Sequence, residues 1–286
     1  MSDLQQKYTS LLQSVQTLEK VMVAFSGGVD STFLVAAVKE SGMPYLAVTA
    51  VSPTMPAQDL ADVKTAISAM QISHRFIESG ELNDDDFVKN SSDRCFFCKS
   101  DLFKRLTDIA QAEGFAAVFD GSTTDDLVDY RPGTKAKNQF QVRSPIQEAG
   151  LSKEEIRQLS REMGLKTWDK PASPCLSSRI SYGEPILTTS LTMVENAEIA
   201  LKNMGFGPLR VRKQGETARI ELTDMDINLI LAPETRKKVT REVLSAGFKF
   251  VALDLEGFQS GKLNRVIPIE KISKSTQDSS AISSRR

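Results

Sequence analysis

The sequence predicts an α/β fold, in which a parallel sheet with helices on both faces is followed by a small α+β domain. Two observations lead to this prediction. In the first 120 residues, short apolar runs typical of buried strands alternate with longer amphipathic segments typical of helices. This alternation indicates βαβ units with right-handed crossovers. Beyond residue 180 the order changes to a helix followed by two short alternating segments around Gln214-Gly215, which is typical of a hairpin.

The first domain is expected to contain four strands, and their apolar runs lie at residues 21–25, 45–51, 73–77 and 116–119. Apolar residues at helical spacing predict helices at 4–18, 32–39, 60–70 and 98–113. The polar segment 122–141 is expected to be a long loop. Ser152 and Glu155 have the spacing of a capping box, so a further helix begins there and ends near Met163.

The segment KPASPCLSSR at residues 170–179 is broken by prolines, and we place the domain boundary there. The first domain therefore spans 1–170 and the second 171–270. In the second, the expected order αββαβ has its helices at 188–204 and 233–246 and its strands at 209–213, 218–222 and 248–255. Residues 271–286 are rich in Ser and Lys and are expected to be disordered.

Charge and hydropathy exclude several classes of function. The 36 basic and 37 acidic residues give a net charge of −1, so no general cationic field attracts nucleic acid, and RNA is not an expected partner. The N-terminus is too polar for a signal peptide, and no apolar run approaches the ~18 residues of a membrane span. We therefore expect a cytoplasmic protein with no membrane partner.

The most specific motif is SGGVDS at residues 26–31, between an expected strand and an expected helix. Such a turn directs several backbone N–H groups toward an anion at the positive end of the helix dipole. Gly27 and Gly28 lack the Cβ atoms that would keep a phosphate away, and Ser26 and Ser31 add hydroxyl donors. Since the spacing and lysine of a Walker A motif are absent, the sequence predicts a polyphosphate site of another type.

This motif resembles the PP-loop, or N-type ATP pyrophosphatase, superfamily, whose fold is adenine nucleotide alpha hydrolase-like. The resemblance covers about the first 145 residues and implies that ATP is cleaved between the α and β phosphates to adenylate a substrate oxygen. It implies that pyrophosphate is held by Ser26, Gly27, Gly28, Asp30 and Ser31. Asp30 would also act in catalysis by helping to place Mg²⁺. The nucleotide pocket would further include Ala24, Thr49 and Gly121.

The chain has three cysteines: Cys95 and Cys98 in a C-F-F-C motif, and Cys175 in the proline-broken segment. In a reducing compartment, an odd number favours metal, redox or nucleophilic use over disulfides. Inert thiols and a redox dithiol remain alternatives. Zinc would need a fourth ligand, and the only histidine, His74, is expected at the surface. We favour a [4Fe–4S] cluster held by the three thiolates, because an open iron position suits carriage of sulfide.

The whole chain resembles the LarE family of sulfur-inserting enzymes, which help to build the nickel-pincer nucleotide cofactor of lactate racemase. The matching motifs are DGST at residue 120, DYRPG at 129, RSP at 143, PCLSSRISYG at 174, RVR at 210, ARIEL at 218 and DLEGFQSGKLN at 254. The resemblance implies that ATP adenylates a carboxylate of pyridinium-3,5-biscarboxylic acid mononucleotide. Sulfur then displaces AMP and leaves a thiocarboxylate.

In one branch of this family, the enzyme's own cysteine is the sulfur source and becomes dehydroalanine. Members with a C-x-x-C motif and the cysteine of the P-C-L-x-S-R segment resemble cluster-dependent enzymes that use exogenous sulfide repeatedly. Because Cys95, Cys98 and Cys175 are all present, we expect the second branch, with Cys175 as the catalytic cysteine. Sacrifice of Cys175 remains an alternative.

Arginines of the second domain are candidates for binding the anionic mononucleotide. Arg210 and Arg212 are separated by one residue of a strand, so their side chains share a face, and an arginine fork suits a phosphate or carboxylate. Arg179 follows Cys175 closely. We expect all three to bind substrate or phosphate. Glu221 could bind a metal or form a salt bridge. Mg²⁺ could also be ordered by Asp125, Asp126 and Asp129, although solvated loop carboxylates are the commoner case.

Other functions remain open at this stage. A PP-loop iron–sulfur tRNA thiolase would need a basic surface, and an amidating PP-loop enzyme or a nucleotide sensor would need no cysteine chemistry. The expected partners are the mononucleotide, a sulfur donor, a downstream nickel-insertion protein and further copies of the chain in a homo-oligomer.

Overall fold

The computed structural model describes residues 2–127, 133–259 and 261–266. It confirms the expected fold class. The first domain contains a parallel sheet in the order β3-β2-β1-β4. Its strands are β1 (Val21–Ala24), β2 (Tyr45–Val51), β3 (His74–Glu78) and β4 (Ala117–Phe119). Because β2 and β4 flank β1 on opposite sides, the sheet has a topological switch point between β1 and β4, and ligands bind at the carboxyl edge of such points.

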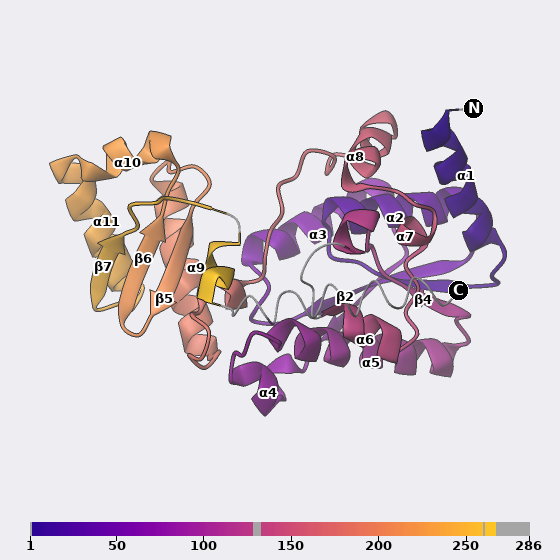
Figure 1. Ribbon diagram of the computed structural model, residues 1–286, viewed down its shortest axis with the longest axis horizontal. Helices are drawn as coiled ribbons and strands as arrows, with labels where there is room; N and C mark the ends of the chain where they lie inside the picture. Colours follow the sequence, from indigo (N-terminus) through magenta and orange to yellow (C-terminus); the bar gives the residue numbers. More distant parts are fainter. Residues whose placement is uncertain (1, 128–132, 260, 267–286) are drawn as a thin grey trace.

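Helices cover both faces of this sheet, so β1 buries side chains in both directions (Figure 1). Val21 and Val23 belong to a core on the face covered by α1 (Asp3–Gln16), α2 (Val29–Glu40) and α8 (Lys153–Glu162). Helix α3 (Ala57–Met70) and the short α7 (Pro145–Glu148) also contribute to this core. Met22 belongs to the core on the opposite face, together with α5 (Arg94–Glu113).

The segment predicted as one long loop at 122–141 contains helical structure, so that prediction is wrong in part. It includes the 3₁₀ helix η2 (Thr124–Leu127) and the helix α6 (Gly133–Gln139). Ala136 of α6 is fully buried in the core with α5. Lys137 is also buried, and its Nζ donates to Ser144 Oγ at 2.8 Å and to Gln147 Oε1 at 3.0 Å. These tertiary contacts stabilise a helix that has little apolar periodicity of its own. Asp129 lies outside the described residues.

The second domain has a three-stranded sheet in the order β5-β6-β7. Strands β5 (Arg210–Gln214) and β6 (Thr217–Glu221) form the expected antiparallel hairpin, whereas β7 (Phe250–Leu253) pairs parallel to β6. Its helices are α9 (Thr188–Asn203), α10 (Asp224–Leu231) and α11 (Pro233–Ser245). The observed order αββααβ therefore contains one helix, α10, that the sequence analysis missed.

Short helical segments complete the described structure: η1 (Glu81–Asn83), α4 (Asp85–Val88), η3 (Leu176–Arg179) and η4 (Lys262–Val266). The boundary placed at residue 170 falls between α8 and η3 and stays a prediction. The tail 271–286 lies outside the described residues. Within the described ranges, no helix combines the length and the apolar character needed to cross a membrane.

The predicted capping box begins α8. Ser152 Oγ accepts from the Glu155 amide at 3.3 Å, and Glu155 Oε2 accepts from the Ser152 amide at 2.8 Å. Since an N-cap hydroxyl contributes about 1 kcal/mol, Ser152→Ala should lower the free energy of unfolding by that amount in urea titrations. Ser10→Ala, in an exposed position of α1, serves as the control and should leave it almost unchanged. Equal losses in the two variants would contradict the capping role.

Candidate active site

The loop between β1 and α2 presents the N-terminus of α2 to a cavity. Gly28 is the N-cap residue of α2 and provides no side-chain cap. The loop is closed by its own serines, because the Ser26 amide donates to Ser31 Oγ at 3.2 Å and the two hydroxyl oxygens lie 3.1 Å apart. Residues 28–31 line the cavity directly. This arrangement is suited to an anion, as expected from SGGVDS, and the assignment of pyrophosphate to it stays a prediction.

Two glycines allow neighbouring elements to approach this loop. Gly27 has φ +68°, and a Cβ there would lie 2.7 Å from Val63 Cγ2 of α3. Gly121 follows β4, and a Cβ there would lie 3.1 Å from the Ser31 amide nitrogen. A side chain at either position would therefore push α3 or the segment after β4 away from the loop.

The cavity has a volume of about 630 Å³ and lies at the carboxyl ends of β1 and β2. It brings together residues predicted to bind the nucleotide and cysteines predicted to act in sulfur chemistry: Ala24, Ser26, Gly28, Asp30, Ser31, Thr49, Gly121, Cys98 and Cys175. Gly27 does not line the cavity, but it allows the loop to pack closely against Val63 of α3. The other predicted site residues do not line this cavity: Cys95, Arg179, Arg210, Arg212 and Glu221. Four basic side chains also line it, namely Lys99, Lys153, Arg157 and Lys170.

Thr49 is held in place by a neutral histidine. Its Oγ1 donates to Phe25 O at 2.7 Å and lies 2.8 Å from His74 Nε2. Because the threonine proton is used on the carbonyl, His74 Nε2 must donate to Thr49. Burial lowers the pKa of His74 to about 4, so the ring is neutral at pH 7. The expectation that His74 is a plain surface residue is therefore wrong.

The three cysteines differ in environment. Cys98 is half-buried just after the first turn of α5, whereas Cys95 and Cys175 are exposed. Burial raises the pKa of the Cys98 thiol well above its ordinary value, and negative charge on Glu81, Cys175 and Cys95 raises it further. Desolvation by surrounding groups also raises the pKa of Cys95, and Cys175 adds to this effect. Charge on Cys175 therefore acts on both Cys95 and Cys98.

These thiols do not form a preformed metal site. Across residues 2–127, 133–259 and 261–266, no three Cys, His, Asp or Glu side chains are grouped closely enough to hold a metal ion. The iron–sulfur assignment of Cys95, Cys98 and Cys175 therefore stays a prediction.

Among the cavity residues that the sequence analysis missed are the buried Glu81 and the linker residue Lys170. Glu81 is 1 % exposed, and its carboxylate accepts from Thr54 Oγ1 at 3.0 Å and from Ser79 Oγ. In the part of the chain that the structure describes, Glu81 forms no ion pair with lysine or arginine. Lys170 lies at the start of the proline-broken segment, and its charge next to Pro171 was the available signal. Glu81 has no comparable signal in the sequence.

Two of the three predicted substrate arginines, Arg179 and Arg212, form ion pairs with buried glutamates in the second domain. Arg179 is buried, and Glu198 accepts from it at 3.0 and 3.1 Å. The same guanidinium donates to the carbonyls of Pro174 and Cys175, the latter at 3.0 Å. Arg179 thus supports the backbone of the Cys175 segment, while its role as a substrate ligand stays a prediction.

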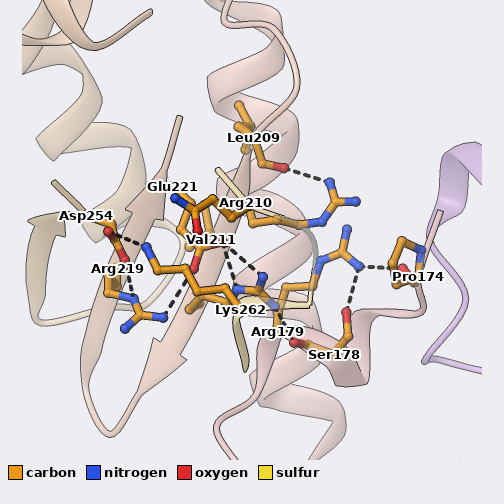
Figure 2. Close-up of polar contacts among 12 residues, drawn as sticks. Pro174, Ser178, Arg179, Leu209, Arg210, Val211, Arg219, Glu221, Asp254 and Lys262 are labelled. Carbon is orange, nitrogen blue, oxygen red and sulfur yellow. Dashed lines mark hydrogen bonds and ion pairs between the residues drawn. The ribbon is translucent and has the colours of Figure 1, made fainter. Parts of the chain in front are cut away.

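Arg210 is not paired with a carboxylate among the described residues and donates instead to Leu209 O at 2.8 Å (Figure 2). Arg212, in contrast, has both a carboxylate and a carbonyl as partners. Arg212 donates to Glu221 Oε2 at 3.0 and 3.1 Å and to Ser178 O at 2.6 Å. Burial, followed by repulsion from Arg179, lowers the pKa of Arg210 to about 10. An anion bound beside Arg210 would relieve that repulsion.

Glu221 is fully buried and forms salt bridges with Arg212 and, at 3.2 Å, with Arg219. The network continues from Arg219 to Asp254 and from Asp254 to Lys262 (Figure 2). Of the two roles expected for Glu221, the salt bridge is the one observed.

Comparison with known proteins gives the family of this chain. No family model matches the chain. It is 36% identical over 270 residues to the pyridinium-3,5-bisthiocarboxylic acid mononucleotide synthase of Lactiplantibacillus plantarum, covering 92% of this chain and 96% of that protein. The chain belongs to the LarE family. An uncharacterized protein of Synechocystis is 42% identical over 92% of this chain and 99% of its own length. One from Methanocaldococcus jannaschii is 28% identical over 85% and 92%, respectively.

The loop geometry makes Gly27 a direct test of the anion site. Gly27→Ala should weaken pyrophosphate binding at least about tenfold in calorimetric titrations, because strain of about 1 kcal/mol adds to the Val63 clash. Gly42→Ala is the matched control, since Gly42 also has a positive φ, +76°, but open space around it. It should lower stability slightly and leave pyrophosphate affinity unchanged. Unchanged affinity in Gly27→Ala would contradict the assignment of this loop.

The thiol environments predict slow alkylation of Cys95 and Cys98. In protein free of iron, both should react more slowly with iodoacetamide at pH 8 than an unperturbed cysteine, because raised pKa values favour the unreactive thiol. The pH at which the alkylation rate is half-maximal should lie above 9.0 for both cysteines, and it should be higher for Cys98 than for Cys95. Mass spectrometry of the separate peptides measures each rate. A profile centred at or below the ordinary thiol pKa would contradict the described surroundings.

Proposed function

We propose that this chain is an ATP-dependent sulfurtransferase that acts on pyridinium-3,5-biscarboxylic acid mononucleotide. A substrate carboxylate oxygen attacks the α-phosphorus of ATP, and pyrophosphate leaves. Sulfur then attacks the carboxyl carbon, and AMP departs with the former carboxylate oxygen, leaving a thiocarboxylate. The product would serve biosynthesis of the nickel-pincer nucleotide cofactor of lactate racemase.

One observation supports this function above the others. The SGGVDS loop and two of the three cysteines, Cys98 and Cys175, line one cavity although they come from three separate parts of the chain. A nucleotide sensor would not need thiols beside its phosphate site. Membership in the LarE family, through a relative named as the bisthiocarboxylic acid mononucleotide synthase, supports the same substrate class.

We assign the nucleotide to the first domain and the anionic end of the mononucleotide to the second. Backbone N–H groups at the N-terminus of α2 and the hydroxyls of Ser26 and Ser31 would hold pyrophosphate, with Asp30 helping to place Mg²⁺. Arg210 is the strongest candidate for the substrate anion, because its cation lacks a carboxylate partner among the described residues. Arg179 and Arg212 would add to the positive potential while fixing the Cys175 segment.

We infer that the three cysteines hold a [4Fe–4S] cluster. The donor set fits such a group in kind, since charge on Cys175 acts on both Cys95 and Cys98, and Cys95 and Cys98 lie three residues apart on one helix. Cys175 lies on an irregular segment and would have to approach the other two. The cluster would supply an open iron position for exogenous sulfide. Cys98 and Cys175 would direct the incoming sulfur toward the adenylated carboxyl group in their shared cavity.

The remaining partners follow from this proposal. They are a sulfide donor, a nickel-insertion protein that consumes the product, and further copies of the chain. We place the enzyme in the cytoplasm, as the sequence predicts.

Anaerobic reconstitution tests the sulfur chemistry. The protein should bind about four iron and four sulfide per chain, as a [4Fe–4S] cluster requires, and Cys175→Ala, Cys95→Ala and Cys98→Ala should each lose most of both. The Cys175→Ala variant should still release pyrophosphate when given ATP and the dicarboxylate but form no thiocarboxylate. Mass spectrometry of the Cys175 peptide after turnover should find it intact. A peptide lighter by H₂S, in protein without iron, would replace this route with sacrifice of Cys175.

A further inference from the structure

The linker at residues 168–176 forms one wall of the cavity. It contains Lys170, which contacts the phosphate loop, and the catalytic cysteine. Five of its residues line the cavity: Lys170, Pro171, Ala172, Ser173 and Cys175. This segment contains no helix or strand before η3. Its position therefore depends on a small number of side-chain contacts.

Most of those contacts attach the linker to the first domain without involving the phosphate loop. Arg157 of α8 donates to Trp168 O at 2.6 Å and to Lys170 O at 2.9 Å. Ser173 Oγ donates to Asp59 of α3 at 2.6 Å. The backbone amide after Cys175 donates to Thr54 O at 2.7 Å. These bonds fix the two ends of the linker.

The Lys170 side chain makes a different set of contacts. Its ammonium lies 2.7 Å from Asp62 Oδ2, 3.4 Å from Asp59 Oδ1 and 3.5 Å from the carbonyl oxygen of Gly27 in the phosphate loop. One positive charge thus lies between two carboxylates at the edge of the anion site. Partial burial would raise the pKa of Asp62, but hydrogen bonds from Lys170 and Gln58 hold it below its ordinary value.

A polyphosphate in this loop would compete for Lys170. Its negative oxygens would lie beside the Gly27 turn, where the two carboxylates repel them and the ammonium attracts them. Asp62 is the more exposed carboxylate, with 33% of its side-chain surface accessible against 14% for Asp59, so losing its partner costs it least. A lysine on a flexible four-carbon chain can change partner with little rearrangement.

We propose that Lys170 is a positioning residue, which exchanges Asp62 for a phosphate oxygen when a polyphosphate binds the Ser26–Ser31 loop and thereby couples nucleotide binding to the placement of Cys175. The cysteine follows five residues later, a span of at most about 17 Å of extended chain. The inference rests on the proposed ATP chemistry. It adds a means by which the thiol segment senses whether the phosphate loop is filled.

A double-mutant cycle with inorganic pyrophosphate tests the exchange. Asp62→Asn should tighten binding up to about fivefold, the energy of one partly exposed ion pair, because Lys170 no longer has to leave a carboxylate. Lys170→Met should weaken binding about tenfold, the loss of one charge-assisted hydrogen bond. In the Lys170→Met background, Asp62→Asn should then give little further gain. An equal gain in both backgrounds would mean that Asp62 acts only by repulsion, and would overturn the exchange.

Hydrogen exchange of the full-length protein supplies the second readout. Saturating pyrophosphate should slow amide exchange in peptides covering 168–176, since Lys170 would link the linker to a bound anion, and Lys170→Met should abolish this effect at saturation. Lys153→Met is the matched control, because Lys153 lines the same cavity but pairs with Asp126 at 2.9 Å. It should retain the effect.

The two proposals fail in different ways. If wild-type protein binds no pyrophosphate, both the proposed function and the coupling are overturned. If it binds pyrophosphate but exchange at 168–176 is unchanged, or is slowed equally in Lys170→Met, only the coupling is overturned.

Discussion

The close approach of backbone at the carboxyl end of β1 is the constraint on which this structure depends. Gly27 allows α3 to pack behind the loop, and Gly121 allows the segment after β4 to touch the start of α2. Since the sheet order reverses between β1 and β4, these contacts occur where a parallel sheet leaves a crevice. An anion site requires exposed N–H groups, and only glycines permit them in such a crowded turn.

The second domain contributes by holding the Cys175 segment against this crevice. Arg179 and Arg212 donate to carbonyls of residues 174–178, and each is itself held by a buried glutamate. Buried ion pairs of this kind add little net stability but specify one geometry, because removing either charge leaves the other unpaired. The Cys175 segment is therefore held by the two arginines and by the bond from the Leu176 amide to Thr54 O. Its thiol remains at the cavity wall.

The sequence predicted the parts of the fold that local pattern determines. Apolar runs identified all four strands of the first sheet, and Ser152 with Glu155 identified the start of α8. The pattern missed α6, because Ala136 and Lys137 are held by contacts with distant elements rather than by periodicity. It also missed α10, whose apolar residues lie directly before Pro233, and it could not show that β7 pairs parallel to β6.

The candidate site was predictable to a similar extent. Motifs in the sequence identify the SGGVDS loop and the cysteines. Whether they line one cavity depends on the path of residues 168–176 in the folded chain, which no motif predicts. Glu81 carries no sequence signal, so only the structure reveals it, whereas Lys170 could have been noted from its charge next to Pro171. The arginines show a different limit. Strand alternation predicts that Arg210 and Arg212 share a face, but it does not show that Arg212 pairs with Glu221. Nor does the sequence show that Arg179 pairs with Glu198.

Isotope transfer tests the central claim, that a substrate carboxylate attacks the α-phosphorus of ATP. The dicarboxylate mononucleotide would be labelled with ¹⁸O in its carboxyl groups and incubated with ATP, Mg²⁺ and sulfide-loaded enzyme. Mass spectrometry should then find one ¹⁸O atom in AMP for each thiocarboxylate formed, with pyrophosphate unlabelled. Unlabelled AMP, or ADP with orthophosphate, would contradict the account.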